Sequence, residues 1–249
     1  LGRAAAARPD DFRKVLKRGE FRTDNGGDES LDEIVNRGEK FLTGYQDSTY
    51  GQRYRKLVER VASAEATIGA TSDYLARAVA RVYWKLLAYK DEYEVARLFV
   101  SNDFREKLDK TFKSGYRLRF HLAPPVLSKT DPVTQRPQKA EFGPWMMYVF
   151  HILAACRRLR GTRFDPFGRS ADRKLERRLI RQYEATIDII LECLGLDNLE
   201  TAIEISSLPL EIRGYGPVKL AAAKVAERKE GALLKKFTTS GRPQRLAAG

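Results

Sequence analysis

Residues 170–194 read "SADRKLERRLIRQYEATIDIILECL", and this stretch decides the fold class. Apolar side chains recur in it at three- and four-residue steps, which is the period of one face of an α-helix. They are Leu175, Leu179, Tyr183, Ile187, Ile190 and Leu194. Basic side chains recur at similar steps on the opposite face, at Arg173, Lys174, Arg177, Arg178 and Arg181. The stretch therefore predicts a long helix with one apolar face and one basic face.

Similar apolar periods on both sides of this stretch predict a mainly α-helical chain. Ser30 and Glu33 form a capping box at the start of one helix, and Ser101 can cap another. Further helices are expected near 10–17 and over about 46–67, 72–88, 91–99, 144–160 and 199–206, with a last one beginning at Pro217.

The pattern changes to a two-residue period between Tyr116 and Leu122, where Tyr, Leu and Phe alternate with Arg and His. The following stretch "VLSKTDPVTQRPQKAEF" ends at Phe142 and has a turn-rich tip at 131–137. We therefore expect a mainly α fold that contains a small antiparallel β-hairpin near 116–142.

Composition limits the class of protein. Hydrophobic residues make up 43% of the 249 residues, enough for a substantial core, and the net charge of +13 favours an anionic partner. The longest apolar run, 145–156, is too short to span a bilayer, and we find no signal peptide. Cys156 and Cys193 are isolated in apolar patterns. These features predict a cytoplasmic protein with two reduced core thiols and no membrane partner.

Neither a metal site nor a catalytic residue is expected from these residues. The two cysteines form no C-x-x-C pair, and His121 and His151 fall in different elements. Asp91 and Glu92 stand together at a helix start, where acidic side chains stabilise the helix dipole without any catalytic role.

The stretch "EIRGYGPVK" at 211–219 allows two interpretations. Gly214 and Gly216 can relieve strain in a turn, and Pro217 suits the first turn of a helix. Alternatively, Arg213 and Lys219 could hold an anion at the helix N-terminus. The spacing matches neither a P-loop nor a dinucleotide fingerprint, so we favour the turn.

The basic residues also allow two interpretations. The segment 157–181 holds ten basic and three acidic side chains. It is either a solvated face or a binding surface for an acidic protein, a phosphorylated ligand or a nucleic acid. Nucleic acid is disfavoured, because stacking aromatic residues are not interleaved with the arginines.

Several stretches, taken together, resemble the C-terminal region of the fused bacterial indolepyruvate ferredoxin oxidoreductases. They are "FLTGYQDSTYGQRYRKLVERV", "AYKDEYEVARLF", "FHLAPP", "EFGPWM", "LRGTRFDPFGR" and "EIRGYGPVK". By this resemblance, residues 1–44 are the tail of a gamma-type oxidoreductase domain and residues 45–249 are the terminal helical domain.

The resemblance implies an enzyme that oxidises 2-oxoacids such as indolepyruvate with thiamine diphosphate, iron–sulfur clusters and coenzyme A, and that reduces ferredoxin. It places that chemistry upstream of Leu1, because these residues hold no thiamine-binding motif and no cysteine cluster. The implied partners are the catalytic domains of the same polypeptide, ferredoxin, and further copies of the enzyme in a homo-oligomer. The role expected for this segment is structural or docking.

Overall fold

The computed structural model describes residues 29–112, 117–122 and 140–240. This part of the chain is mainly α-helical and contains one two-stranded antiparallel sheet, which confirms the expected fold class. The chain divides into two compact units, Lys90–Arg173 and the remainder, called here the middle unit and the bundle unit. The helix expected near 10–17 and the hairpin tip at 131–137 lie outside the described residues.

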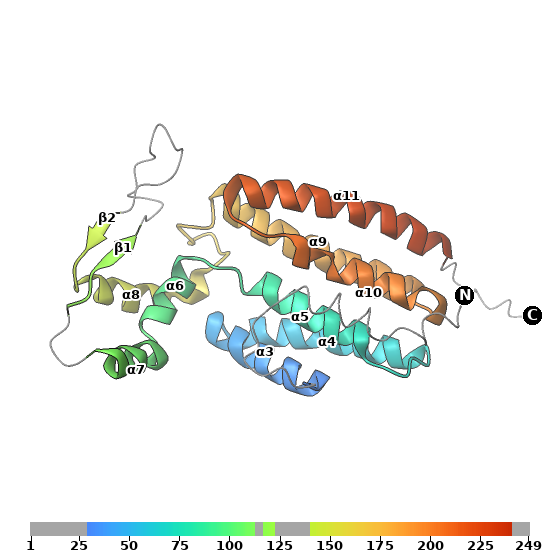
Figure 1. The fold of residues 1–249 in the computed structure, drawn as a ribbon, viewed down its shortest axis with the longest axis horizontal. Coiled ribbons are helices and arrows are strands. Elements are labelled where there is room, and N and C mark those ends of the chain that lie inside the picture. The colour runs from blue at the N-terminus through green and yellow to red at the C-terminus, as the bar shows by residue number, and fades with distance from the viewer. Residues whose placement is uncertain (1–28, 113–116, 123–139, 241–249) are drawn as a thin grey trace, which may run out of the picture. The chain divides into compact units, whose positions relative to one another are not determined.

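The described residues of the bundle unit form six α-helices. They are α3 (Leu31–Tyr45), α4 (Ser48–Thr67), α5 (Tyr74–Leu87), all but the first turn of α9 (Ala171–Cys193), α10 (Leu199–Ser207) and α11 (Gly216–Ser240), with short 3-10 turns η2 (Leu196–Asn198) and η3 (Leu208–Glu211). Helix α3 packs against α4 and α5, and α10 packs against α5 and α11 (Figure 1). The apolar face predicted for α9 contributes Leu175, Leu179, Tyr183, Ile187 and Ile190 to the buried core.

Side chains cap these helices both where the sequence predicts a cap and where it does not. Ser30 and Glu33 form the expected capping box of α3. Helix α5 is capped by Glu65 of α4, whose carboxylate accepts the N–H groups of Leu75 and Ala76 at 2.8 and 2.9 Å. Glu65 occupies a position of the apolar stripe of α4 and is only 2% exposed. Its charge is buried because it satisfies two N–H groups that a helix start leaves without partners.

Stacked tyrosines join α9 to the rest of the bundle. The rings of Tyr54, Tyr83 and Tyr183 stack in sequence, with centroid distances of 6.1 and 6.0 Å. The Tyr183 hydroxyl donates to the Ser206 carbonyl of α10. These contacts give α9 polar and aromatic anchors in addition to its apolar face.

The middle unit contains α6 (Glu92–Phe99), α7 (Asn102–Thr111), β1 (Phe120–Leu122), β2 (Ala140–Phe142), α8 (Met146–Ala155) and the 3-10 turn η1 (Cys156–Leu159). Strands β1 and β2 pair antiparallel with Phe120 opposite Phe142. Phe99 stacks on Phe150 at 4.8 Å, and Phe120 meets both rings edge-on. The aromatic cluster packs α6, α8 and the sheet into one small core.

Three details differ from the sequence-based expectation. The described strand pairing covers three residues from Phe120, shorter than the alternation suggests. The helix expected over 144–160 is α-helical only as far as Ala155 and then tightens into η1. Cys156 and Cys193 are free thiols, as expected, but are partly exposed instead of fully buried.

Within the described ranges, no helix is both long and apolar enough to cross a membrane.

Candidate functional site

The basic residues of α9 do not form one uniform surface. Arg173 lies 3.4 Å from Glu92 of α6, and both side chains are largely buried. Arg178 lies 2.9 Å from Glu227 of α11. Arg177 is half-buried and is also engaged in an interaction. Arg181 is exposed. Of the four arginines predicted to bind an anion or partner, three therefore have contacts within the protein.

Helix α11 lies alongside α9 (Figure 1), and polar residues of α9 form hydrogen bonds and ion pairs with α11. Lys219 forms an ion pair with Glu176, and Gln182 donates to Glu230 at 2.7 Å. Thr186 also donates to Glu230. Charged and polar residues on α9 thus position α11, in addition to any role at the surface.

The "RGYGP" stretch forms the turn that leads into α11. Gly214 and Gly216 have φ values of +94° and +54°, a region that side-chain-bearing residues rarely adopt. A Cβ on Gly214 would lie 2.7 Å from Val218 Cγ1. The helix begins at Gly216, with Pro217 in its first turn. This geometry is the one that the turn interpretation requires.

Lys219, the other half of the anion interpretation, already faces a carboxylate. Its Nζ donates to both oxygens of Glu176, at 2.6 and 2.7 Å. The side chains are 22% and 10% exposed, so the pair is mostly shielded from water. Any anion at this helix start would compete with Glu176 for the ammonium group.

Lys85 joins this group although no motif marks it in the sequence. It lies in the last turn of α5, and its Nζ donates to the carbonyls of Pro209 and Leu210 at 3.4 and 3.3 Å. Burial, together with the charges of Arg213 and Lys219, lowers the pKa of Lys85 to about 8, while Glu176 opposes the shift. Three cationic side chains and one carboxylate therefore interact at the start of α11.

A second polar network lies in the middle unit and is almost fully buried. The Arg160 guanidinium donates to both oxygens of Asp91, at 2.5 and 2.9 Å, with the two side chains 2% and 3% exposed. Asp91 also caps α6 by accepting the Glu94 N–H. Asp165 accepts hydrogen bonds from Gly161 N–H and Tyr93 O–H. The stretches "KDEY" and "RGTRFDPFG" thus meet in one network.

This network corrects the reading of two residues. Asp91 does stabilise a helix start, as expected, but it is also the partner of a buried arginine sixty-nine positions away. Arg160 was counted in the basic segment 157–181, yet its charge is neutralised inside the middle unit. The sequence holds one weak signal of this network: the glycines and the proline of "RGTRFDPFG", which are residue types that favour a tight loop.

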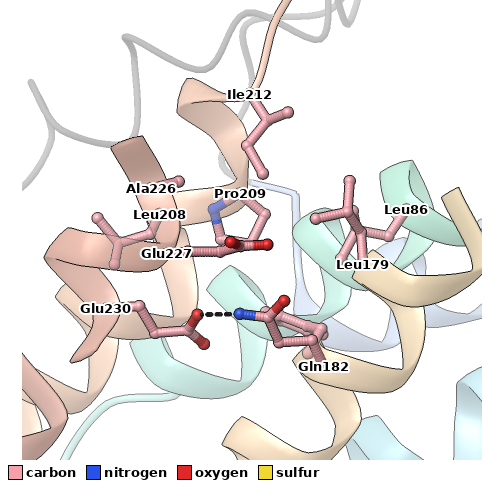
Figure 2. Close-up of a pocket in the computed structure, with 10 residues that line it drawn as sticks. Leu86, Leu179, Gln182, Leu208, Pro209, Ile212, Ala226, Glu227 and Glu230 are labelled. Carbon is pink, nitrogen blue, oxygen red and sulfur yellow. Dashed lines mark hydrogen bonds between the residues drawn. The ribbon is translucent and has the colours of Figure 1, made fainter. Parts of the chain in front are cut away.

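A small cavity of about 20 Å³ lies in the bundle unit between α5, α9, η3 and α11 (Figure 2). Leu86, Leu179, Leu208 and Ile212 form apolar walls. Two carboxylates, Glu227 and Glu230, lie on the α11 side, and Figure 2 shows Glu230 hydrogen-bonded to Gln182. A cavity of this size has room for about one water molecule and is too small for a ligand.

Metal-binding clusters are absent from the part of the chain that the structure describes. Within those ranges, no three His, Cys, Asp or Glu side chains converge in a way that could hold a metal ion. His121 and His151 are both exposed, on β1 and α8.

A family model described as a family of unknown function (DUF6537) matches residues 31–231, most of the chain, and the chain therefore belongs to that family. Neither the curated proteins nor the solved structures contain a match.

Proposed function

We propose that this DUF6537 family member is a structural or docking domain of a 2-oxoacid ferredoxin oxidoreductase of the indolepyruvate type. In this proposal, thiamine diphosphate, the iron–sulfur clusters and coenzyme A bind to catalytic domains upstream of Leu1. The present residues pack against those domains or help the enzyme to form a homo-oligomer.

One observation carries the structural role: the stretches that resemble the oxidoreductase family hold this domain together. Asp91 of "KDEY" pairs with Arg160 of "RGTRFDPFG" inside the middle unit. Gly214 and Gly216 of "RGYGP" take up the positive φ values that start α11. A sequence pattern that determines packing, loop shape and helix starts is typical of a scaffold.

The enzyme class rests on the sequence resemblance, so it is tested by isolating the natural polypeptide that carries this segment and measuring its activity. A C-terminal affinity tag placed in the native host isolates that polypeptide with its upstream domains and partners. We expect it to reduce a redox dye when indolepyruvate and coenzyme A are both supplied. A purified polypeptide that begins near Leu1 and lacks this activity would exclude the enzyme class, whatever the role of the helices.

A second function is a basic binding module. Lys174 and Arg181 are exposed on α9, and the chain carries a net charge of +13. These charges could attract an acidic protein such as ferredoxin, and the group of Lys85, Arg213 and Lys219 could attract a phosphorylated ligand. Nucleic acid remains the least favoured ligand, because the exposed arginines of α9 have no stacking aromatics between them.

Charge reversal tests this second function. Arg181→Glu with Lys174→Glu should slow association with ferredoxin and flatten its dependence on salt, since exposed charges act mainly on the association rate. The matched control is Lys224→Glu with Lys235→Glu, two exposed residues of α11 that change the same total charge. If the two pairs of substitutions had equal effects, association would depend on net charge alone, and the basic face of α9 would not be a binding surface.

A further inference from the structure

Helix α8 carries no Asp, Glu, Lys or Arg, but only one of its faces lies in the core of the middle unit. Met146, Phe150 and Ala154 lie in the core of that unit. On the other side, Trp145, which immediately precedes the helix, is 55% exposed, Tyr148 is 75% exposed and Ile152 is 64% exposed. Their spacing of three and four residues places them along one face.

A row of this kind differs from the scattered exposed apolar side chains that every protein carries. Large apolar residues that adjoin one another at a surface mark interaction sites, and Trp and Tyr are the residue types that most often dominate binding energy. The row needs a cover that the described residues of the middle unit do not supply.

The charges of the same stretch of chain indicate the charge of that cover. Between residues 140 and 173, all of which the structure describes, the exposed charged side chains are Arg158, Arg163, Arg169, Glu141 and Asp172, and Glu141 is already paired with Arg119 at 2.7 Å. A third carboxylate, Asp165, is buried and accepts hydrogen bonds from Gly161 and Tyr93. The exposed charge of this stretch is therefore net positive. Because η1 directly continues α8, Arg158 follows Ile152 and Ala155 at helical spacing.

We propose that the face of α8 formed by Trp145, Tyr148 and Ile152, with Arg158 beyond its C-terminal end, docks an acidic protein. The apolar row forms the centre of the interface, and the arginines meet carboxylates of the partner at its edge. This inference rests on the exposure and charge of the middle unit, and it holds or fails independently of the enzyme class proposed above.

Two other covers fit the same face less well. A second copy of the chain would bring equivalent arginines toward one another, because a twofold interface uses the same patch twice. A membrane-surface helix carries a polar face rich in Lys and Arg, whereas α8 has no Asp, Glu, Lys or Arg from Met146 to Ala155.

Site-specific photocrosslinking in the native host tests the proposal. A benzophenone amino acid replaces Tyr148 in one strain and Tyr215 in the control strain. Tyr215 is also a tyrosine, is 79% exposed, and lies in the bundle unit. We expect position 148 to give an adduct with an acidic polypeptide, cross-linked near its carboxylates, and position 215 to give none.

Two variants separate specific docking from chance capture. Ile152→Ser and Arg158→Glu change exposed side chains, so thermal melting should be unchanged, while the adduct should fall about tenfold or more in each. In an extract of the same strain irradiated at an ionic strength of about 0.5 M, the adduct should also be reduced. The proposal is overturned by an adduct with lipid, with a second copy or within the chain itself. It is also overturned by no adduct, by a basic or neutral partner, or by yields that neither variant changes.

Discussion

Replacing Arg160 by Met should destabilise the middle unit more than any change of a surface charge. The side chains of Arg160 and Asp91 are 2% and 3% exposed, and they share hydrogen bonds of 2.5 and 2.9 Å. Without Arg160, the Asp91 carboxylate keeps the Glu94 N–H at 2.8 Å but loses its counter-charge in a site that excludes water. Removing one member of a buried ion pair costs about 3–5 kcal/mol of unfolding free energy.

A double-mutant cycle separates the pair from its parts. Asp91→Ala should cost a similar amount, with about 1 kcal/mol of it from the lost cap of α6. The double variant should cost clearly less than the sum, because no buried charge is left without its partner. Arg173→Met is the matched control, since Arg173 pairs with Glu92 in the same unit at 3.4 Å and is more exposed; it should cost about 1 kcal/mol or less.

Urea unfolding followed by circular dichroism gives the free energies, and hydrogen exchange of the α6 amides assigns the loss to the middle unit. The reasoning is refuted if Arg160→Met costs no more than Arg173→Met, or if the single costs add fully in the double variant.

Three further changes test other parts of the structure. Gly214→Ala should lower unfolding free energy by about 1 kcal/mol or more, and by more than Gly216→Ala, because only the first Cβ meets Val218; comparable urea midpoints would argue against this. Glu65→Ala should cost about 2–3 kcal/mol and Glu65→Gln roughly half, since Gln keeps one acceptor for the α5 N–H groups; equal losses would exclude the cap. The pKa of Lys85 in the folded state lies below its ordinary value of 10.5, so the folded state holds fewer protons than the unfolded state between about pH 8 and 10.5. The free energy of unfolding should therefore rise with pH in this range, and Lys85→Met should flatten the corresponding rise in melting temperature.

Local sequence patterns predicted much of this fold. The capping residues Ser30 and Ser101 act within their own helices, on N–H groups three residues away. The apolar face of α9 is buried because helical periodicity itself decides which side chains can reach a core. The positive φ values of Gly214 and Gly216 follow from a turn chemistry that glycine alone accepts easily.

The partners of charged residues could not be predicted in the same way. Asp91 and Arg160 are far apart in sequence, and nothing in the spacing of either indicates the other. Lys219 looked available for an anion until packing of α11 against α9 placed Glu176 beside it. Lys85 has no distinctive motif at all, and its lowered pKa arises from burial and from cations on other elements. Such pairs depend on tertiary packing, which periodicity does not encode.

The domain boundary is a further point on which sequence and packing give different divisions. The resemblance divides the chain after residue 44, whereas packing places α3 in the bundle unit with α4 and α5. A boundary inferred from resemblance reflects how segments are joined along a polypeptide. The compact units reflect which helices bury apolar surface together.

If this segment supports an enzyme whose cofactors bind elsewhere, as we propose, purified residues 1–249 should carry none of those cofactors. Metal analysis, an ultraviolet–visible spectrum and a thiamine assay are applied to the chain after expression with iron and thiamine supplied. We expect neither bound iron nor bound thiamine, because the sequence holds no cysteine cluster and no thiamine-binding motif. A stoichiometric iron–sulfur absorption band, or one equivalent of thiamine diphosphate, would contradict this proposal.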